Sequence, residues 1–263
     1  MEVTQLSDKN RIERYLRQET YLQIYSIGDL DDFFWPYTQW YALESNGEIQ
    51  ALTMLYSAFQ PPVFLGLAGE RWISALKQLI ESQISNLPPT IYAHLNPGLD
   101  QLFRETHDLI HHGEHFKMAF VDDQPINSVD VSCVEPLLTA DADELIALYT
   151  DSYPDNAFDP RMLESRKYFG VRVNQRIVSA GGIHVYSKQY RVAAIGNIVT
   201  HPDHRGRGLG TAVTAQICSA LLHEVDNIGL NVKTDNEPAI SCYQKLGFTP
   251  ISTYHEWTIT KKD

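Results

Sequence analysis

The pattern of apolar and polar positions divides the second half of the chain into extended and helical segments. Residues 168–173 and 176–185 alternate around the polar pair Asn174-Gln175, which predicts two strands joined by a short turn. A further extended run covers 190–200. The segment 209–225 predicts a helix, because its apolar residues recur every four positions. These residues are Leu209, Val213, Ile217 and Leu221.

The other segments complete the element order of a mixed α/β fold. In the second half we expect strands at 129–134, 228–232 and 253–259, a helix from Asp141 or Asp143 to Tyr149, and a helix beginning near Pro238. The strand at 253–259 is expected to close the sheet of this half. In the first half we expect a hairpin of 39–43 with 49–56, strands at 91–94 and 115–121, and helices at 70–84 and 98–106. The polar segment 121–128 predicts a boundary between domains at 1–124 and 129–263.

The stretch Arg205-Gly206-Arg207-Gly208-Leu209-Gly210-Thr211 has the composition of an anion-binding turn. It lies between an expected strand and an expected helix. Glycines let backbone N–H groups approach an oxyanion, and the first helical turn leaves several such groups unpaired. Two guanidinium groups add charge-assisted contacts. A P-loop is excluded because no lysine lies between Arg191 and Lys233. The turn therefore predicts a phosphorylated ligand, most simply a diphosphate.

Two motifs in this half resemble those of the GNAT acetyltransferase superfamily. Arg205, Gly208 and Gly210 fall on the fixed positions of that family's coenzyme A loop, Gln/Arg-x-x-Gly-x-Gly/Ala. The segment 236–248 resembles its second motif, Asn-x-x-Ala-x-x-x-Tyr-x-x-x-Gly-Phe. The resemblance covers 129–263 and implies an α/β (α+β) fold, a mixed, mainly antiparallel twisted sheet flanked by helices. The smaller α/β domain before it is interpreted as a degenerate copy of that fold or, alternatively, as a dimerisation module of a homodimer.

The resemblance also implies how acetyl-CoA would bind as co-substrate. Backbone groups of Ile198 and Thr200, with Val199 between them, would pair with the amides of the pantetheine arm. The N–H groups from Arg205 to Thr211 would hold the pyrophosphate, and Asn236 would bond the arm from the other side. A backbone N–H near Ile198 or Val199 would polarise the thioester carbonyl.

The catalytic groups follow from the same resemblance. Tyr243 matches the tyrosine that faces the thioester sulfur, where a phenol can protonate the departing thiolate; the alternative is a core tyrosine. Many relatives carry a glutamate as general base on the strand before the loop, but Ala194 occupies that position here. His184 is the best side-chain candidate for the base, and a water held by Asn197 is an alternative.

Two polar clusters have less defined roles. The loop 149–159 is expected to flank the acceptor pocket, where its three aspartates and three aromatic residues could bind an ammonium group; a solvated loop is the alternative. The histidines at 107, 111, 112 and 115 are interpreted as a surface cluster around a turn, and no metal is expected.

Composition narrows the functional class. The net charge of −12 argues against nucleic-acid binding, and no apolar run is long enough to span a membrane. Three cysteines and a polar N-terminus without a signal peptide are typical of a cytoplasmic protein. We therefore expect an N-acyltransferase that transfers an acetyl group from acetyl-CoA to an amine of a small molecule or peptide in a ternary complex. A non-catalytic acyl-CoA sensor or interaction module is the alternative, and the acceptor is left open.

Overall fold

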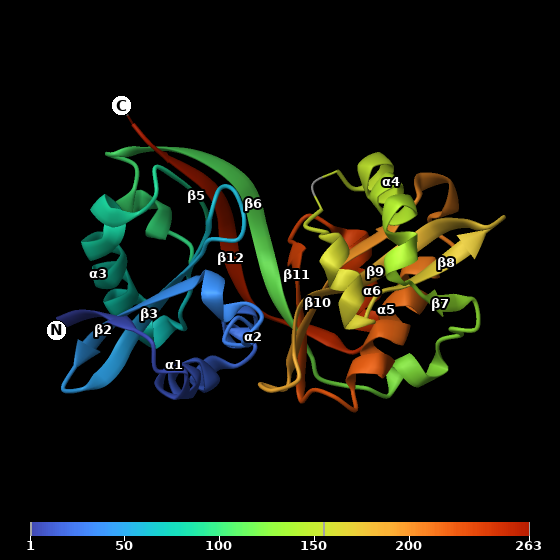
Figure 1. Cartoon of the computed structure of the whole chain (residues 1–263), viewed down its shortest axis with the longest axis horizontal. Helices are drawn as coiled ribbons and strands as arrows, with labels where there is room; N and C mark the ends of the chain where they lie inside the picture. Colours follow the sequence, from blue (N-terminus) through green and yellow to red (C-terminus); the bar gives the residue numbers. More distant parts are fainter. Residues whose placement is uncertain (1, 155, 263) are drawn as a thin grey trace. The chain divides into compact units, whose positions relative to one another are not determined.

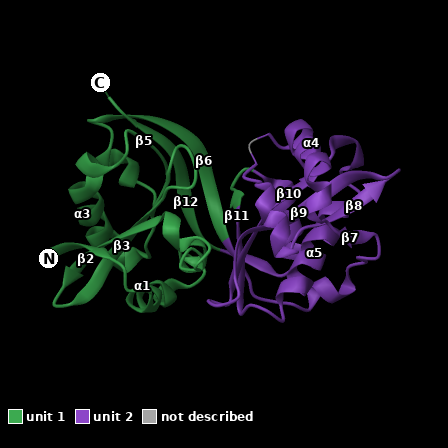
Figure 2. Cartoon of the chain, in the orientation of Figure 1, with its two compact units in different colours: residues 1–117, 232–235, 251–263 green, residues 118–231, 236–250 purple. Residues whose placement is uncertain are grey.

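The computed structural model describes residues 2–154 and 156–262, which form two compact units (Figures 1 and 2). Unit 1 comprises residues 1–117, 232–235 and 251–263, and unit 2 comprises 118–231 and 236–250. The expected domains, 1–124 and 129–263, differ from these units in the placement of residues 118–124, 232–235 and 251–263. The division into domains at 1–124 and 129–263 remains a prediction.

Runs of consecutive strands are separated by helices along the chain. The strands are β1 (Glu2–Leu6), β2 (Thr38–Ser45), β3 (Glu48–Tyr56), β4 (Val63–Gly66), β5 (Thr90–Leu95), β6 (His107–Phe120), β7 (Val134–Pro136), β8 (Phe169–Val173), β9 (Arg176–Ser187), β10 (Val192–Thr200), β11 (Asn227–Lys233) and β12 (Phe248–Lys261). The α-helices are α1 (Lys9–Leu16), α2 (Ile24–Gly28), α3 (Ile73–Gln83), α4 (Ala142–Ser152), α5 (Leu209–Leu221) and α6 (Glu237–Lys245). Within the described residues, no helix is both long and apolar enough to cross a membrane.

Unit 1 contains a mixed sheet with the strand order β1-β2-β3-β4-β5-β12-β6. Strands β4 and β5 run parallel, whereas β1–β2, β2–β3, β3–β4 and β5–β12 are antiparallel pairs. The expected hairpin is confirmed as β2 and β3, and its turn residues Asn46 and Gly47 have the positive φ values that a tight hairpin turn requires.

The C-terminal strand is present but pairs in unit 1. The residues from His255 to Thr260 lie antiparallel to β5, from Leu95 to Thr90. The expectation that this strand closes the sheet of the second half was therefore wrong. Alternation of side chains predicts that a segment is extended, but it carries no information on which strand becomes its neighbour.

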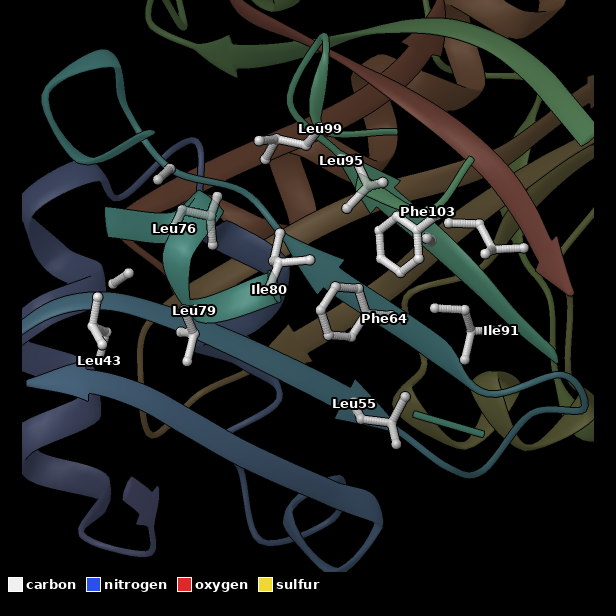
Figure 3. Close-up of a cluster of buried hydrophobic side chains, with 14 residues drawn as sticks. Leu43, Leu55, Phe64, Leu76, Leu79, Ile80, Ile91, Leu95, Leu99 and Phe103 are labelled. Carbon is white, nitrogen blue, oxygen red and sulfur yellow. The ribbon is translucent and has the colours of Figure 1, made fainter. Parts of the chain in front are cut away.

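The apolar core of unit 1 lies where α3 packs on the sheet (Figure 3). Leu76, Leu79 and Ile80 of α3 are fully buried, and they share one cluster with Phe64 of β4 and Ile91 of β5. Residues three and four apart lie on one face of a helix, which is why the apolar positions of the segment 70–84 predicted this packing.

Strands β5, β12 and β6 also carry a buried polar cluster, centred on Glu256. The Glu256 carboxylate accepts hydrogen bonds from the hydroxyls of Tyr92 and Tyr254 and lies 3.5 Å from His94 Nε2 and 3.7 Å from His115 Nε2. The histidine-rich segment is thus part of β6 and not a turn. A positive φ of 113° at Gly113 allows the strand to continue through it.

Unit 2 contains the strand order β11-β10-β9-β8-β7, with β10 and β11 parallel and the other pairs antiparallel. Helix α5 packs against β8, β9 and β10, and α4 packs against β9 and β10. The expected fold class, a mainly antiparallel mixed sheet flanked by helices, is confirmed.

The expected strand at 129–134 is much shorter. Only Val134–Pro136 forms β7, which pairs with β8. The Asp130 carboxylate accepts a hydrogen bond from the backbone of Ser132 at 2.9 Å. Such an aspartate turn competes with extended backbone, so the alternation in this segment did not lead to pairing.

Candidate functional site

Strand β10 separates from β11 before it ends. Its parallel ladder with β11 runs from Val192 to Ile195, and no further paired position follows in the described part of the chain. On its other side β10 stays paired with β9 to Thr200, across a bulge between Gly196 and Val199. The last residues of β10 therefore have one edge that is outside the sheet ladder. An extended ligand could bind its amides there.

The direction of the backbone groups distinguishes the three residues at this edge. The carbonyl oxygen of Val199 faces β9, where it accepts a hydrogen bond from Ser179 Oγ at 3.0 Å. Backbone groups alternate along a strand, so those of Ile198 and Thr200 point to the open edge. The Thr200 carbonyl already accepts Arg205 Nε at 3.0 Å. Ile198 is thus the residue whose backbone best fits the predicted contact with a ligand amide.

The glycine-rich turn has a left-handed backbone at two of its glycines. Gly206 and Gly208 have φ values of 75° and 76°, and a β-carbon at either would meet no atom within 4 Å. Their glycine requirement therefore comes from the left-handed backbone and not from crowding. Gly208 precedes α5, whose first hydrogen bond runs from Ala212 N to Gly208 O at 3.0 Å. The N–H groups of residues 209–211 come before this bond and have no acceptor within the helix.

The two arginines of the turn hold its backbone. Arg205 bonds Thr200 O, and Arg207 donates from a terminal nitrogen to Asp203 O at 3.1 Å. Both side chains are exposed. A guanidinium has five N–H donors, so each group can keep its contact to the backbone and still bind an anion.

Helix α6 faces the turn through a contact between Cys242 Sγ and Thr211 Oγ1 of α5, at 3.2 Å. Asn236 caps α6, because its side-chain oxygen accepts Ala239 N at 3.2 Å, and Pro238 lies in the first turn as expected. Only the amide nitrogen of Asn236 is therefore suited to the expected contact with the pantetheine arm.

Tyr243 lies on the buried side of α6, with 9% of its surface exposed. Burial raises the pKa of its phenol, and nearby Cys242 and Tyr153 raise it further. The hydroxyl therefore keeps its proton at neutral pH, as a general acid must. The proximity of Tyr153, which follows α4, was not anticipated from the sequence, because residues 90 positions apart give no signal of contact.

His184 of β9 lies against Gly196 of β10. A β-carbon on Gly196 would be 2.4 Å from Nε2 of the imidazole, so only glycine leaves room for the ring. Gly196 is the first residue of β10 beyond its ladder with β11. The predicted base candidate is thus next to the open edge. Ala194, where relatives carry the glutamate, is fully buried.

The loop expected to bind an ammonium group is mostly occupied by its own contacts. Tyr149 is buried, and Phe158 packs between it and Tyr168, with ring centroids at 5.1 Å and 5.3 Å. Asp151 pairs with His201 at 3.3 Å, and Asp159 pairs with Arg161 at 2.6 Å. Tyr153 is 39% exposed. Asp155 lies outside the described residues.

The alternative role of Asn197 as a holder of a catalytic water does not agree with its contacts. Its side chain is 3% exposed. The amide oxygen accepts Ala157 N at 3.1 Å, and the amide nitrogen donates to Tyr168 Oη at 3.0 Å. A polar side chain that is buried and bonded at both ends serves to fix its surroundings.

Comparison with known proteins agrees with the motifs and the fold. The model of the acetyltransferase (GNAT) family matches residues 134–248. The uncharacterized N-acetyltransferase YobR of Bacillus subtilis is 30% identical over 96 residues, which are 36% of this chain and 38% of YobR. The chain thus spans less than half the length of this relative.

Solved structures resemble the whole chain at low identity, which shows the fold alone. A Drosophila protein is 12% identical with a TM-score of 0.73, and 98% of each chain is covered. A tandem GNAT protein from the clavulanic acid biosynthesis pathway is 16% identical with a TM-score of 0.53, covering 100% of this chain and 99% of its own. The second likeness is consistent with the interpretation of the first half as a degenerate copy. Residues 134–248 thus form a domain of the acetyltransferase (GNAT) family.

Proposed function

We propose that unit 2 transfers an acetyl group from acetyl-CoA to an amine of a small molecule or peptide, within a ternary complex. The observation that carries this proposal is the junction of two features in one short segment. The open edge of β10 ends at Thr200, and the anion-binding turn follows from Arg205. A thioester carrier needs both features in this order, because its amide arm connects the reactive sulfur to a diphosphate.

The donor would bind in an extended form along this segment. Backbone groups of Ile198 and Thr200 would pair with the arm. The N–H groups from Gly206 to Thr211 would bind the pyrophosphate, because the Arg205 N–H already donates to Pro202 O at 3.2 Å. Asn236 would add a side-chain contact through its amide nitrogen. The backbone N–H of Ile198 would stabilise the negative charge that develops on the thioester oxygen. The alternation of backbone groups supports Ile198 over Val199 in this role.

The acyl transfer would proceed in one complex. The lone pair of the acceptor amine attacks the thioester carbon, a tetrahedral intermediate forms, and the C–S bond then breaks. Tyr243 gives its proton to the departing thiolate, and the amine loses a proton to His184 or to solvent. Burial of Tyr243 and the packing of His184 against Gly196, where β10 leaves β11, support these assignments.

The proposal is tested by thiol release from acetyl-CoA with a panel of amines. The enzyme should release free thiol only when an acceptor is present. Binding of acetyl-CoA without acceptor-dependent release across the panel would favour the alternative, a non-catalytic acyl-CoA sensor. Gly208→Glu should abolish binding by placing a carboxylate beside the pyrophosphate. Gly208→Ala, which carries the same backbone strain without the charge, is its matched control and should retain most of the affinity.

A further inference from the structure

Asn197 connects the cofactor edge of the proposed site to the loop on its acceptor side, and we propose that it is a positioning residue for acyl transfer. The inference rests on the proposed function. Asn197 occupies the bulge of β10 directly before Ile198, with a φ of 54° in the left-handed region. Asparagine enters this region more readily than most residues, and here it is also buried, with 3% of its surface exposed.

Three hydrogen bonds fix this residue to three separate segments. Its backbone carbonyl accepts the hydroxyl of Tyr149 from α4 at 2.7 Å. Its side-chain oxygen accepts Ala157 N from the loop after α4 at 3.1 Å. Its side-chain nitrogen donates to the Tyr168 hydroxyl at 3.0 Å, which in turn donates to Ile183 O of β9 at 3.2 Å. Each polar group of Asn197 named here thus has a defined partner.

Apolar packing reinforces the same connection. Tyr149 and Tyr168 are 2% and 0% exposed, and the ring of Phe158 lies between theirs. The backbone of residues 157–158 is therefore held against β10 both by the Asn197 amide and by the tilted and edge-on contacts of the Phe158 ring with Tyr149 and Tyr168. A displacement of this loop would move the peptide group between Asn197 and Ile198.

The hydrogen bonds of Asn197 should affect the rate of transfer and not the binding of the donor. The anion-binding turn begins eight residues after Asn197 and does not depend on these bonds, so affinity for the phosphates should persist without them. The peptide at Ile198 has to meet the thioester oxygen with the accuracy that transition-state stabilisation requires, about 0.5 Å. Loss of the Asn197 amide should therefore reduce kcat and leave donor binding nearly unchanged.

The test compares Asn197→Gly and Tyr149→Phe with wild type, using acetyl-CoA and an amine that wild type accepts. Asn197→Gly tolerates the left-handed backbone and removes only the amide. We expect its kcat to fall at least tenfold, with the Kd of acetyl-CoA within threefold of wild type, and Tyr149→Phe to show a smaller fall. Tyr186→Phe is the control, because it removes a β9 phenol whose partner, Glu224, lies outside this network; its kcat should stay within twofold.

Hydrogen exchange supplies a second readout that needs no activity. Exchange of the Ala157 amide should accelerate in Asn197→Gly and not in Tyr186→Phe. A kcat within twofold of wild type in Asn197→Gly would overturn the proposal, as would a fall that the control reproduces at equal loss of thermal stability. A wild-type protein that neither binds acetyl-CoA nor releases thiol would reject the proposed function instead. Unchanged exchange of the Ala157 amide in Asn197→Gly would reject the proposed connection between Asn197 and the loop after α4.

Discussion

The aromatic ring of Tyr168 lies flat against the backbone of Gly182. A β-carbon built on Gly182 would be 2.3 Å from the ring, closer than any two non-bonded carbon atoms can approach. Tyr168 is completely buried, and its hydroxyl bonds the Asn197 amide. The glycine on β9 therefore determines where the tyrosine sits, and through it the geometry of the bulge in β10.

Gly182→Ala should destabilise unit 2 by about 1–3 kcal/mol, because the added methyl group must displace a buried ring. We also expect a reduced kcat, since the ring carries the partner of Asn197. Chemical denaturation followed by steady-state kinetics measures both effects. In a Tyr168→Ala background the same glycine substitution should cost little further stability. An equal loss of stability in both backgrounds would show that the added methyl group does not contact the ring of Tyr168.

Tyr243→Phe should slow acetyl transfer by about 10²–10⁴-fold with little change in the Kd of acetyl-CoA, because only the proton donor to the thiolate is lost. Single-turnover kinetics and a binding titration separate the two quantities. A thioester whose thiol has a low pKa leaves without a proton, so the variant should approach the wild-type rate with such a donor. A variant that is equally slow with both donors would place Tyr243 in packing and not in acid catalysis.

His184→Gln should lower kcat for amines that are largely protonated at neutral pH, by about tenfold or more, because these acceptors need a base. Amines of low pKa arrive deprotonated and should react at nearly the wild-type rate. The measurement is kcat for a series of acceptors of graded pKa. A uniform reduction across the series would mean that the ring only shapes the strand surface at Gly196.

The ionisation of Glu256 makes the stability of unit 1 depend on pH. Its burial opposes ionisation, but His94, His115 and two tyrosine hydroxyls outweigh this and lower the pKa of the carboxyl from 4.5 to about 2. A carboxyl with a lowered folded pKa stabilises the fold above its unfolded pKa, and that contribution is lost as pH falls from about 4.5 to 2. Glu256→Gln should thus be less stable than wild type at pH 7, by roughly 1–3 kcal/mol, and the difference should shrink across that window. Denaturant titrations at several pH values test this, and a difference independent of pH would contradict it.

The parts of the fold and of the site that depend on local sequence pattern could be predicted from the sequence. The helix over 209–225 follows from four-residue spacing, and the turn at Arg205–Thr211 from its glycines and arginines. The structure has both features, because local backbone preference determines them. Helix α5 forms, and Gly206 and Gly208 take positive φ values.

The rest depends on contacts between distant segments. The pairing of β12 with β5 could not be read from the alternation at 253–259, because a strand pattern does not name its partner. Asn197 appeared only as a holder of water, since its bonds to Tyr168 and Ala157 join residues 29 and 40 positions away. The proximity of Tyr153 to Tyr243 could not be predicted from the sequence for the same reason.

The central claim is that backbone donors of the turn at Arg205–Thr211 bind the diphosphate of an acyl-CoA. Isothermal titration at two temperatures with acetyl-CoA and with acetyl-pantetheine, which has the same arm without the nucleotide diphosphate, tests it most directly. We predict saturable binding of acetyl-CoA at one site, at least tenfold weaker binding of acetyl-pantetheine, and no binding of acetyl-CoA by Gly208→Glu. Equal affinity for the two compounds, or no binding of acetyl-CoA to the folded wild-type protein, would contradict the account.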